Sequence, residues 1–423
     1  MEEKWEAAVA VINCILMSYP YRYLAIILLC GLAHTGWAQD SLSAPLGAAS
    51  PYRMAPNSSE ITVDFLSSYF EQDGDRAAVT GGKGTEQLTD FSNALVVNVP
   101  LDSANALNVY AGADYYSSAS TDNIDNFRSS ASSSDTRAFA TVSYRRKRLE
   151  TGETFGLKAG ISTEYDYQSY SAGASYAREW NRGNSEINVT AQAFFGDWSL
   201  IYPYELRGST ELTNSKRQSY NGQINFSQVL NKRMQLSLSA EVVKMSGLLS
   251  TPFHRVYFAD GTVPDIERLP SSRLKIPLGL RFNYYPADNW VLRTYYRYYW
   301  DDFDITSHTF ELETPVNIST FMTVSPFYRF HTQNGSSYFA PYQAHSVSNP
   351  FYTSDYDLST FQSHKFGLTL RYAPVYGLLR SKKVAQINRA VIWKSVAVRI
   401  GSYRRSNGLN AYFASLSLEA SIK

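Results

Sequence analysis

Arginine and lysine side chains recur at even spacings along several stretches in the second half of the chain. Residues two apart on an extended strand share a face, so these cations would gather on one surface. A wall of cations inside a low-dielectric tube concentrates anions and slows other cations. We therefore predict an anion-attracting lumen, and its basic residues are Arg273, Lys275, Arg281, Arg293, Arg297, Arg329, Arg371 and Arg399.

Acidic residues offer a second interpretation of the same cations. Buried charges are normally paired, so the cations could instead hold a narrow tube together through salt bridges. The net charge of the chain is only +1, and any preference for anions must come from local arrangement. The sequence leaves both interpretations open. The acids expected to face inward are Glu164, Asp166, Glu241, Asp301, Glu311 and Glu313.

Acidic clusters between the predicted strands have the chemistry of a calcium site. Carboxylate and carbonyl oxygens at close spacing suit this hard cation. The clusters do not match the helix-loop-helix calcium motif, and Asp-Gly and Asp-Asn pairs are also common in turns, which the sequence favours. Calcium is the one cofactor for which we find candidate ligands. These are Asp73, Asp75, Asp122 and Asp125, and a further acidic cluster contains Asp355 and Asp357.

Two pairs of neighbouring residues, Ser307-His308 and Ser363-His364, raise the question of a hydrolase. Adjacent side chains on a strand point to opposite faces, so neither serine can use the adjoining histidine as its base. No cysteine or histidine spacing typical of a metal site is present in the sequence. We expect no enzyme, and a lipid-modifying enzyme is the least favoured alternative.

Two loop segments carry other features. Residues 81–85 (Gly-Gly-Lys-Gly-Thr) have the composition of a phosphate-binding loop but not its first glycine or following helix, and predict a flexible external loop.

Residues 250–258 are too apolar to extend into water. We expect them to fold into the mouth of the tube and constrict it through Phe253, His254 and Arg255. The alternative is a loop that packs on its neighbours and has no gating role.

The elements that must position these residues are strands with one apolar and one polar face. From Met234 to Val242 the even positions are apolar and the odd ones are polar. This two-residue period is typical of a strand. The chain has 32 Tyr, 22 Phe and 7 Trp, which suit bilayer interfaces, and a mean hydropathy of −0.29, which requires many water-facing residues. A transmembrane barrel is predicted, with a soluble secreted all-β protein as the alternative.

We count about sixteen such strands between residue 60 and the C-terminus, within a range of 14–18. Short turns alternate with long loops, as in outer-membrane barrels, whose turns are periplasmic and whose loops are external. An even count then places both termini in the periplasm. The long, basic turn at 375–388 departs from this pattern and is either a periplasmic excursion or a missed strand pair.

The N-terminal region predicts export. An apolar run at 24–32 follows Arg22 and precedes Gly36-Trp37-Ala38, which is typical of a signal peptide over residues 1–38. The acidic residues near the N-terminus do not suit a signal peptide, so Met17 is an alternative start. Residues 39–59 predict a short disordered periplasmic arm, and residues 60–423 the barrel. Both cysteines precede the predicted cleavage site, so the mature chain would have none.

Several short strings make the chain similar to an uncharacterised bacterial outer-membrane family, domain of unknown function 3570. They lie at 71–82, 120–125, 249–258, 298–303 and 352–358. This resemblance implies a location in the outer membrane of a Gram-negative bacterium. It brings no catalytic residue, because the activity of the family is not established.

These observations predict a porin-like channel for passive or weakly selective passage of small solutes. The expected partners are membrane lipid, small solutes and, during insertion, the barrel-assembly machinery, but not nucleic acid. The oligomeric state stays open. A surface-binding or structural barrel with a closed lumen is the main alternative.

Overall fold

The computed structural model describes residues 60–117, 134–203, 205, 214–379, 382–384 and 389–422. The predicted signal peptide at 1–38, the alternative start Met17, the arm at 39–59 and the acidic residues Asp122 and Asp125 lie outside these residues.

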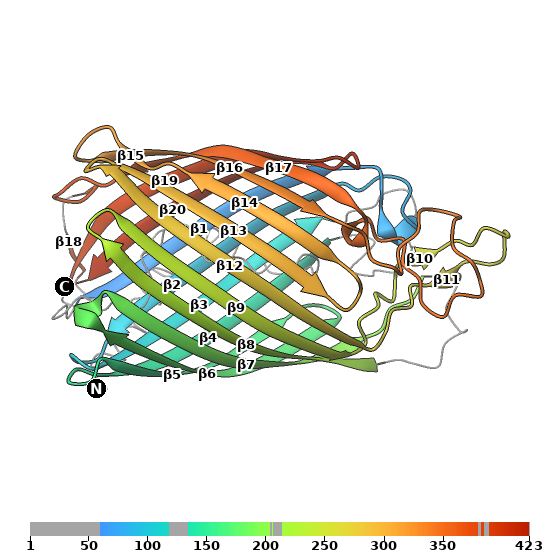
Figure 1. The fold of residues 1–423 in the computed structure, drawn as a ribbon, viewed down its shortest axis with the longest axis horizontal. Coiled ribbons are helices and arrows are strands. Elements are labelled where there is room, and N and C mark those ends of the chain that lie inside the picture. Colours follow the sequence, from blue (N-terminus) through green and yellow to red (C-terminus); the bar gives the residue numbers. More distant parts are fainter. Residues whose placement is uncertain are drawn as a thin grey trace.

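The apolar-polar alternation forms one closed antiparallel sheet of sixteen membrane-spanning strands (Figure 1). Strand β1 pairs with β20 from Ile61↔Ile422 onward, which closes the ring. The predicted count of sixteen is confirmed. The strands are β1 (Ile61–Asp73), β2 (Leu88–Pro100), β3 (Asn105–Ser117), β4 (Ser134–Arg148), β5 (Glu153–Thr163), β6 (Tyr167–Trp180), β7 (Ser185–Ser199), β8 (Asn214–Asn231), β9 (Met234–Gly247), β12 (Ser272–Ala287), β13 (Trp290–Asp301), β14 (Thr306–Glu313), β16 (Met322–Gln333), β17 (Phe361–Tyr372), β19 (Arg389–Arg405) and β20 (Asn410–Ile422).

The remaining elements are short. β15 prolongs the path of β14 between β13 and β16, and β18 pairs only with β19. The long turn after β17 therefore contains one short strand and, in its described part, no further spanning pair. No helix in the described part of the chain is long and apolar enough to cross a bilayer. The short elements are β10 (Arg255–Val256), β11 (Asp265–Ile266), β15 (Val316–Asn317), β18 (Lys382–Val384) and the 3-10 turns η1 (Ala78–Thr80), η2 (Asn181–Gly183) and η4 (Tyr356–Leu358).

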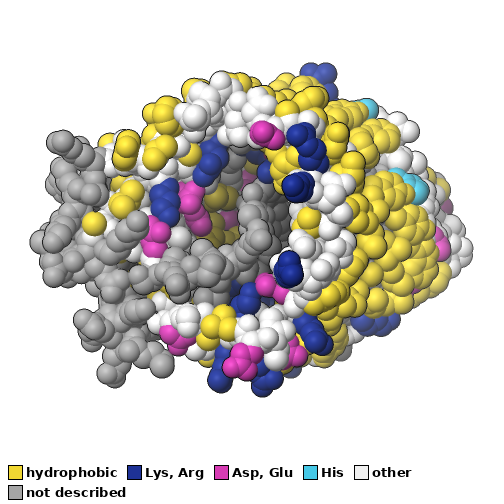
Figure 2. Space-filling view, turned by 60° about the vertical axis from the view of Figure 1, so that its left-hand side comes forward, with side chains coloured by type: hydrophobic (Ala, Val, Ile, Leu, Met, Phe, Trp, Pro, Cys, Tyr) yellow, Lys and Arg dark blue, Asp and Glu magenta, His cyan; other side chains and the backbone are white. Residues whose placement is uncertain are grey.

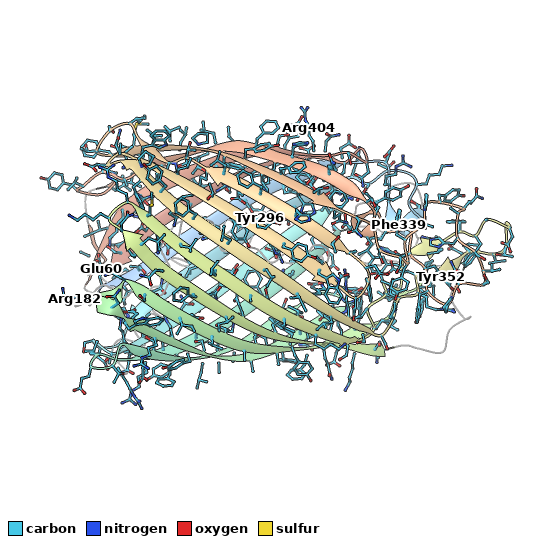
Figure 3. All side chains as sticks on the ribbon, viewed as in Figure 1. Glu60, Arg182, Tyr296, Phe339, Tyr352 and Arg404 are labelled. Carbon is cyan, nitrogen blue, oxygen red and sulfur yellow. The ribbon has the colours of Figure 1, made fainter. Side chains whose placement is uncertain are left out.

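The two ends of the barrel differ. The end that carries β10 and β11, which we name the long-loop end, projects well beyond the strands, and Phe339 and Tyr352 lie there (Figure 3). The other, short-turn end carries Glu60 and Arg182. Figure 2 shows this end hollowed, with Lys and Arg side chains around the opening and an apolar outer wall beside it. The polar faces of the strands therefore enclose the interior.

Because the apolar face is outward, we predict that arginine has very different effects on stability at two adjacent positions of β8. Ile224 is 44% exposed on the outer face, whereas Gln223 faces inward and pairs in register with Glu241. Arginine at Ile224 should destabilise the barrel in lipid by about 2–4 kcal/mol, and arginine at Gln223 should be tolerated because Glu241 can pair with it. Urea unfolding in phospholipid vesicles measures both variants. Equal losses would contradict the outward apolar face.

Candidate functional site

The strand registers place all eight predicted cations on the inner face. On β12 the outer face carries Leu278 and Leu280, so the alternate positions of Arg273, Lys275 and Arg281 face the lumen. The pairings Gly279↔Arg297 and Asn283↔Arg293 extend this face to β13. The same alternation places Arg329 on β16, Arg371 on β17 and Arg399 on β19 inward. These strands form a basic wall over β12–β19.

Several of these cations contact inward carboxylates, as in the salt-bridge interpretation. Arg273 pairs with the fully buried Asp301. Arg293 Nη1 lies 3.1 Å from Glu313 Oε2, and Arg399 Nη1 lies 3.8 Å from the other oxygen of that carboxylate. On β17 and β20, Arg371 Nη2 lies 3.1 Å from Glu419 Oε2. This part of the wall is held by ion pairs.

Arg281 and Arg297 differ from these paired cations. Among the described residues, neither has a carboxylate within ion-pair distance. Each lies over an aromatic ring of the same wall: the Arg281 Cζ atom is 5.3 Å from the ring centre of Tyr295, and the Arg297 Cζ atom is 5.9 Å from that of Tyr299. A cation on an aromatic face keeps its charge available to a passing anion.

Phenylalanine rings in the lumen are the part of this wall that we did not predict. Arg399 Cζ lies 3.8 Å from the ring centre of Phe327, and Lys365 Nζ lies 4.3 Å from that of Phe413. Both rings lie at odd-numbered positions, on the same face as the inward cations. The apolar-polar alternation of the strands would therefore have placed them in the lumen. The composition predicted aromatic rings at the membrane interfaces, and these two phenylalanines lie elsewhere.

Another part of the inner wall, over β5–β8, is lined mainly by small or neutral polar side chains. Register pairs such as Gly173↔Gln192 and Gln192↔Asn221 alternate with outward apolar residues. Lys158 Nζ donates a hydrogen bond to Gln192 Oε1 on this wall. The lumen is therefore asymmetric, with positive charge concentrated on one side. The neutral side chains are Ser169, Ser171, Ser175, Gln192, Asn221 and Gln223.

Loops from opposite sides of the barrel meet at the long-loop end. The loop at 74–87 leaves the ring eight strands away from the loop at 248–271. Arg255 of the second loop donates a hydrogen bond from Nη1 to the Val79 carbonyl oxygen of the first, 2.8 Å away, and pairs with Glu205 of the β7–β8 loop. Because these loops start on opposite walls, this contact crosses the mouth. We name loops 74–87, 248–271 and 334–360 together the loop cap.

Glycines of the first loop are packed between the other two. Gly81 and Gly82 have φ of 80° and 84°, where side chains other than glycine are strained. A Cβ atom at Gly81 would lie 2.5 Å from the Tyr257 ring, and one at Gly82 would lie 2.8 Å from the Ser354 carbonyl oxygen. The interpretation of residues 81–85 as a flexible loop is therefore wrong, because the segment is fixed between its neighbours.

The predicted constriction residues all lie in the cap. Arg255 and His254 are buried, and Phe253 packs edge-on against the His254 ring with centroids 5.6 Å apart. The same loop, 248–271, also contacts loop 334–360, because Arg268 and Tyr352 exchange backbone hydrogen bonds of 3.1 and 2.7 Å. These contacts describe a packed segment across the mouth. Its effect on passage stays a prediction.

One buried cluster in the cap joins residues that the sequence did not connect with one another. His254, Glu267 and Asp355 are each more than nine-tenths buried, and one ligand atom from each lies within 4.8 Å of the others. Burial lowers the pKa of His254, but the adjacent Glu267 carboxylate and two further acids outweigh this and raise it. Burial and the charge of Asp357 raise the pKa of Asp355. No sequence motif joins residues that are so far apart in the chain.

Two other predicted calcium ligands in the described part of the chain, Asp73 and Asp75, do not belong to this cluster. Asp73 accepts a hydrogen bond from Gln87 Nε2 at 3.3 Å, and Asp75 lies 3.4 Å from Arg76 Nε. Calcium at these loops stays a prediction.

The two serine-histidine neighbours lie on opposite faces. Ser307 and Ser363 are buried on the inner side. On the outer side, His308 Nδ1 is 2.7 Å from the Tyr296 hydroxyl, and His364 Nδ1 is 2.8 Å from that of Tyr328. Neither serine contacts the histidine beside it in the sequence.

Comparisons with solved structures give low similarity. A bacterial polysaccharide outer membrane secretin is 9% identical, with a TM-score of 0.42 and coverage of 86% of this chain and 99% of that one. A BenF-like porin from Pseudomonas fluorescens Pf-5 is 9% identical (TM-score 0.40, coverage 85% and 98%). The siderophore receptor PirA from Acinetobacter baumannii is 10% identical (TM-score 0.42, coverage 81% and 53%), so this chain spans about half its length. Similarity this low carries no argument about function.

None of the curated proteins matches the chain. The family model described as "Protein of unknown function (DUF3570)" matches residues 46–378, which is most of the chain. The resemblance noted from the sequence is thereby confirmed. The chain belongs to this family.

Proposed function

We propose that the protein is an outer-membrane channel for the passive, weakly anion-selective passage of small solutes. The observation that carries this proposal is the asymmetric lumen, in which Arg281 and Arg297 lie over tyrosine rings on the basic wall while the wall over β5–β8 is mainly neutral. Barrels of about sixteen strands are wide enough for an aqueous channel. Positive charge on one wall of a low-dielectric tube raises the local concentration of anions.

In this proposal the short-turn end and both termini face the periplasm, and the loop cap faces outward. Solutes enter at the long-loop end and pass along the basic wall. Membrane lipid surrounds the barrel, and the barrel-assembly machinery inserts it. The packed contacts of Arg255 and Tyr257 support a constriction at the outer mouth.

Reconstitution in planar bilayers tests the channel. We expect stepwise conductance, with a reversal potential in a potassium chloride gradient that indicates preference for chloride. Repeating the gradient with a larger organic anion gives the size limit. Absence of conductance, or preference for potassium, would contradict the proposal.

A closed surface barrel is the second candidate, and the cap favours it. Loops that join opposite walls by hydrogen bonds, as Arg255 and Val79 do, could seal the lumen permanently. Such a barrel would show no conductance in any loop variant, whereas a constricted channel would conduct more when the cap is loosened.

A further inference from the structure

The buried cluster of the loop cap joins two separate loops. His254 and Glu267 belong to the loop between β9 and β12, and Asp355 belongs to the loop between β16 and β17. His254 Nδ1 lies 3.6 Å from Glu267 Oε1, and the ligand atoms of all three residues lie within 4.8 Å of one another. The group is the one set of three or more histidine, cysteine or acidic residues in the described part of the chain with this closeness.

The charges around this cluster are predominantly negative. The charges of Glu267 and Asp357 act on Asp355, and those of Asp355 and Asp357 act on Glu86. Arg405 pairs with Asp357 rather than with the cluster. Burial and the charge of Asp357 raise the pKa of Glu86 to about 7. With the imidazole neutral and both carboxylates ionised, the state in which all three can bind a metal, the cluster carries two negative charges that a divalent cation neutralises.

Neighbouring groups hold the ligand side chains in place. The Thr251 backbone amide donates a 2.6 Å hydrogen bond to Glu267 Oε2, and the Thr353 hydroxyl donates to Glu267 Oε1. The Asp357 backbone amide donates a 2.9 Å hydrogen bond to Asp355 Oδ1. A carboxylate has about four lone-pair sites, so each retains capacity for a metal bond. Hydrogen bonds of this kind typically orient metal ligands.

We propose that His254, Glu267 and Asp355 bind one divalent transition cation of the zinc type. This ion holds loops 248–271 and 334–360 of the cap together. Imidazole nitrogen with two carboxylate oxygens and a water suits Zn²⁺, whereas Ca²⁺ takes oxygen ligands only. Bonds of about 2.0–2.2 Å require ligand atoms closer than the present separations, so binding draws the two loops together. The inference does not depend on whether the lumen conducts.

Metal analysis of the processed, full-length protein in detergent tests this site. After treatment with a chelator and dialysis against zinc sulfate, we expect one zinc per chain, unaffected by excess calcium. Cobalt in place of zinc should give the intense visible absorption of a four- or five-coordinate ion with a nitrogen ligand. The variants H254A, E267Q and D355N should each bind zinc roughly 100-fold more weakly.

Two other cap residues provide matched controls. His345 bonds through Nε2 to the Thr353 carbonyl oxygen, and Asp265 accepts a bond from the Tyr352 hydroxyl, yet neither belongs to the cluster. H345Q and D265N should bind zinc as the unmodified protein does. If they lose zinc as the ligand variants do, or if the unmodified protein retains none, the proposal is overturned. If a ligand variant does not fold, the cobalt spectrum of the unmodified protein decides the outcome.

Discussion

Valine in place of Gly81 should open the long-loop end of the barrel and raise its single-channel conductance. Gly81 has a φ of +80°, and an added Cβ atom would lie 2.5 Å from the Tyr257 ring. The valine side chain would therefore clash with Tyr257 and push loops 74–87 and 248–271 apart. Overpacking of this kind costs about 1–3 kcal/mol, which shifts the closed-to-open equilibrium of the cap by roughly 5- to 150-fold.

Gly261 provides the matched control for the G81V substitution. It lies in the loop at 248–271 with a φ of +76°, but a Cβ atom there would meet nothing within 4 Å. G261V has the same kind of backbone strain but no steric clash, so its conductance should equal that of the unmodified protein. Limited proteolysis of the loops reports cap opening independently. A G81V cap that is cleaved faster while conductance stays unchanged would show that the cap does not limit passage.

The fold was predictable because its signal is local. Alternation in a stretch such as 234–242 identifies both the strand and its outward face, and a closed barrel repeats this rule in every strand. The parity of residues such as Arg297 then follows without knowledge of the partner strand. The outward position of His308 beside Phe310 follows from the same rule.

The loop cap was not predictable because its contacts join distant parts of the chain. Arg255 bonds to Val79, 176 positions away, and Asp355 meets His254 only because two loops fold over one another. No periodic pattern relates such residues. The glycines at 81–84 indicate backbone freedom, but only the neighbouring Tyr257 ring shows that this freedom is used for close packing. The sequence thus indicated an apolar loop at the mouth but not what holds it there.

Exchange of Arg281 and Arg297 for glutamate should invert the ion preference of the channel. The two cations lie on the inner face, and among the described residues neither pairs with a carboxylate. The double variant changes the charge of the basic wall by four units. At about 10 Å in water, each unit is worth about 0.4 kcal/mol to a monovalent ion before salt screening. We expect the anion-to-cation permeability ratio to fall by roughly tenfold at low ionic strength.

The control for this exchange carries the same change of net charge outside the lumen. Arg404 projects from the outer surface of the barrel and Arg182 lies in a short turn (Figure 3), and both are exposed. The R182E/R404E variant should keep the reversal potential of the unmodified protein, and R281Q/R297Q should give an intermediate value. High salt should reduce all differences, because screening weakens each lumen charge. A reversal potential that follows net charge alike in both double variants would mean that bulk surface charge, not the basic wall, selects the ion.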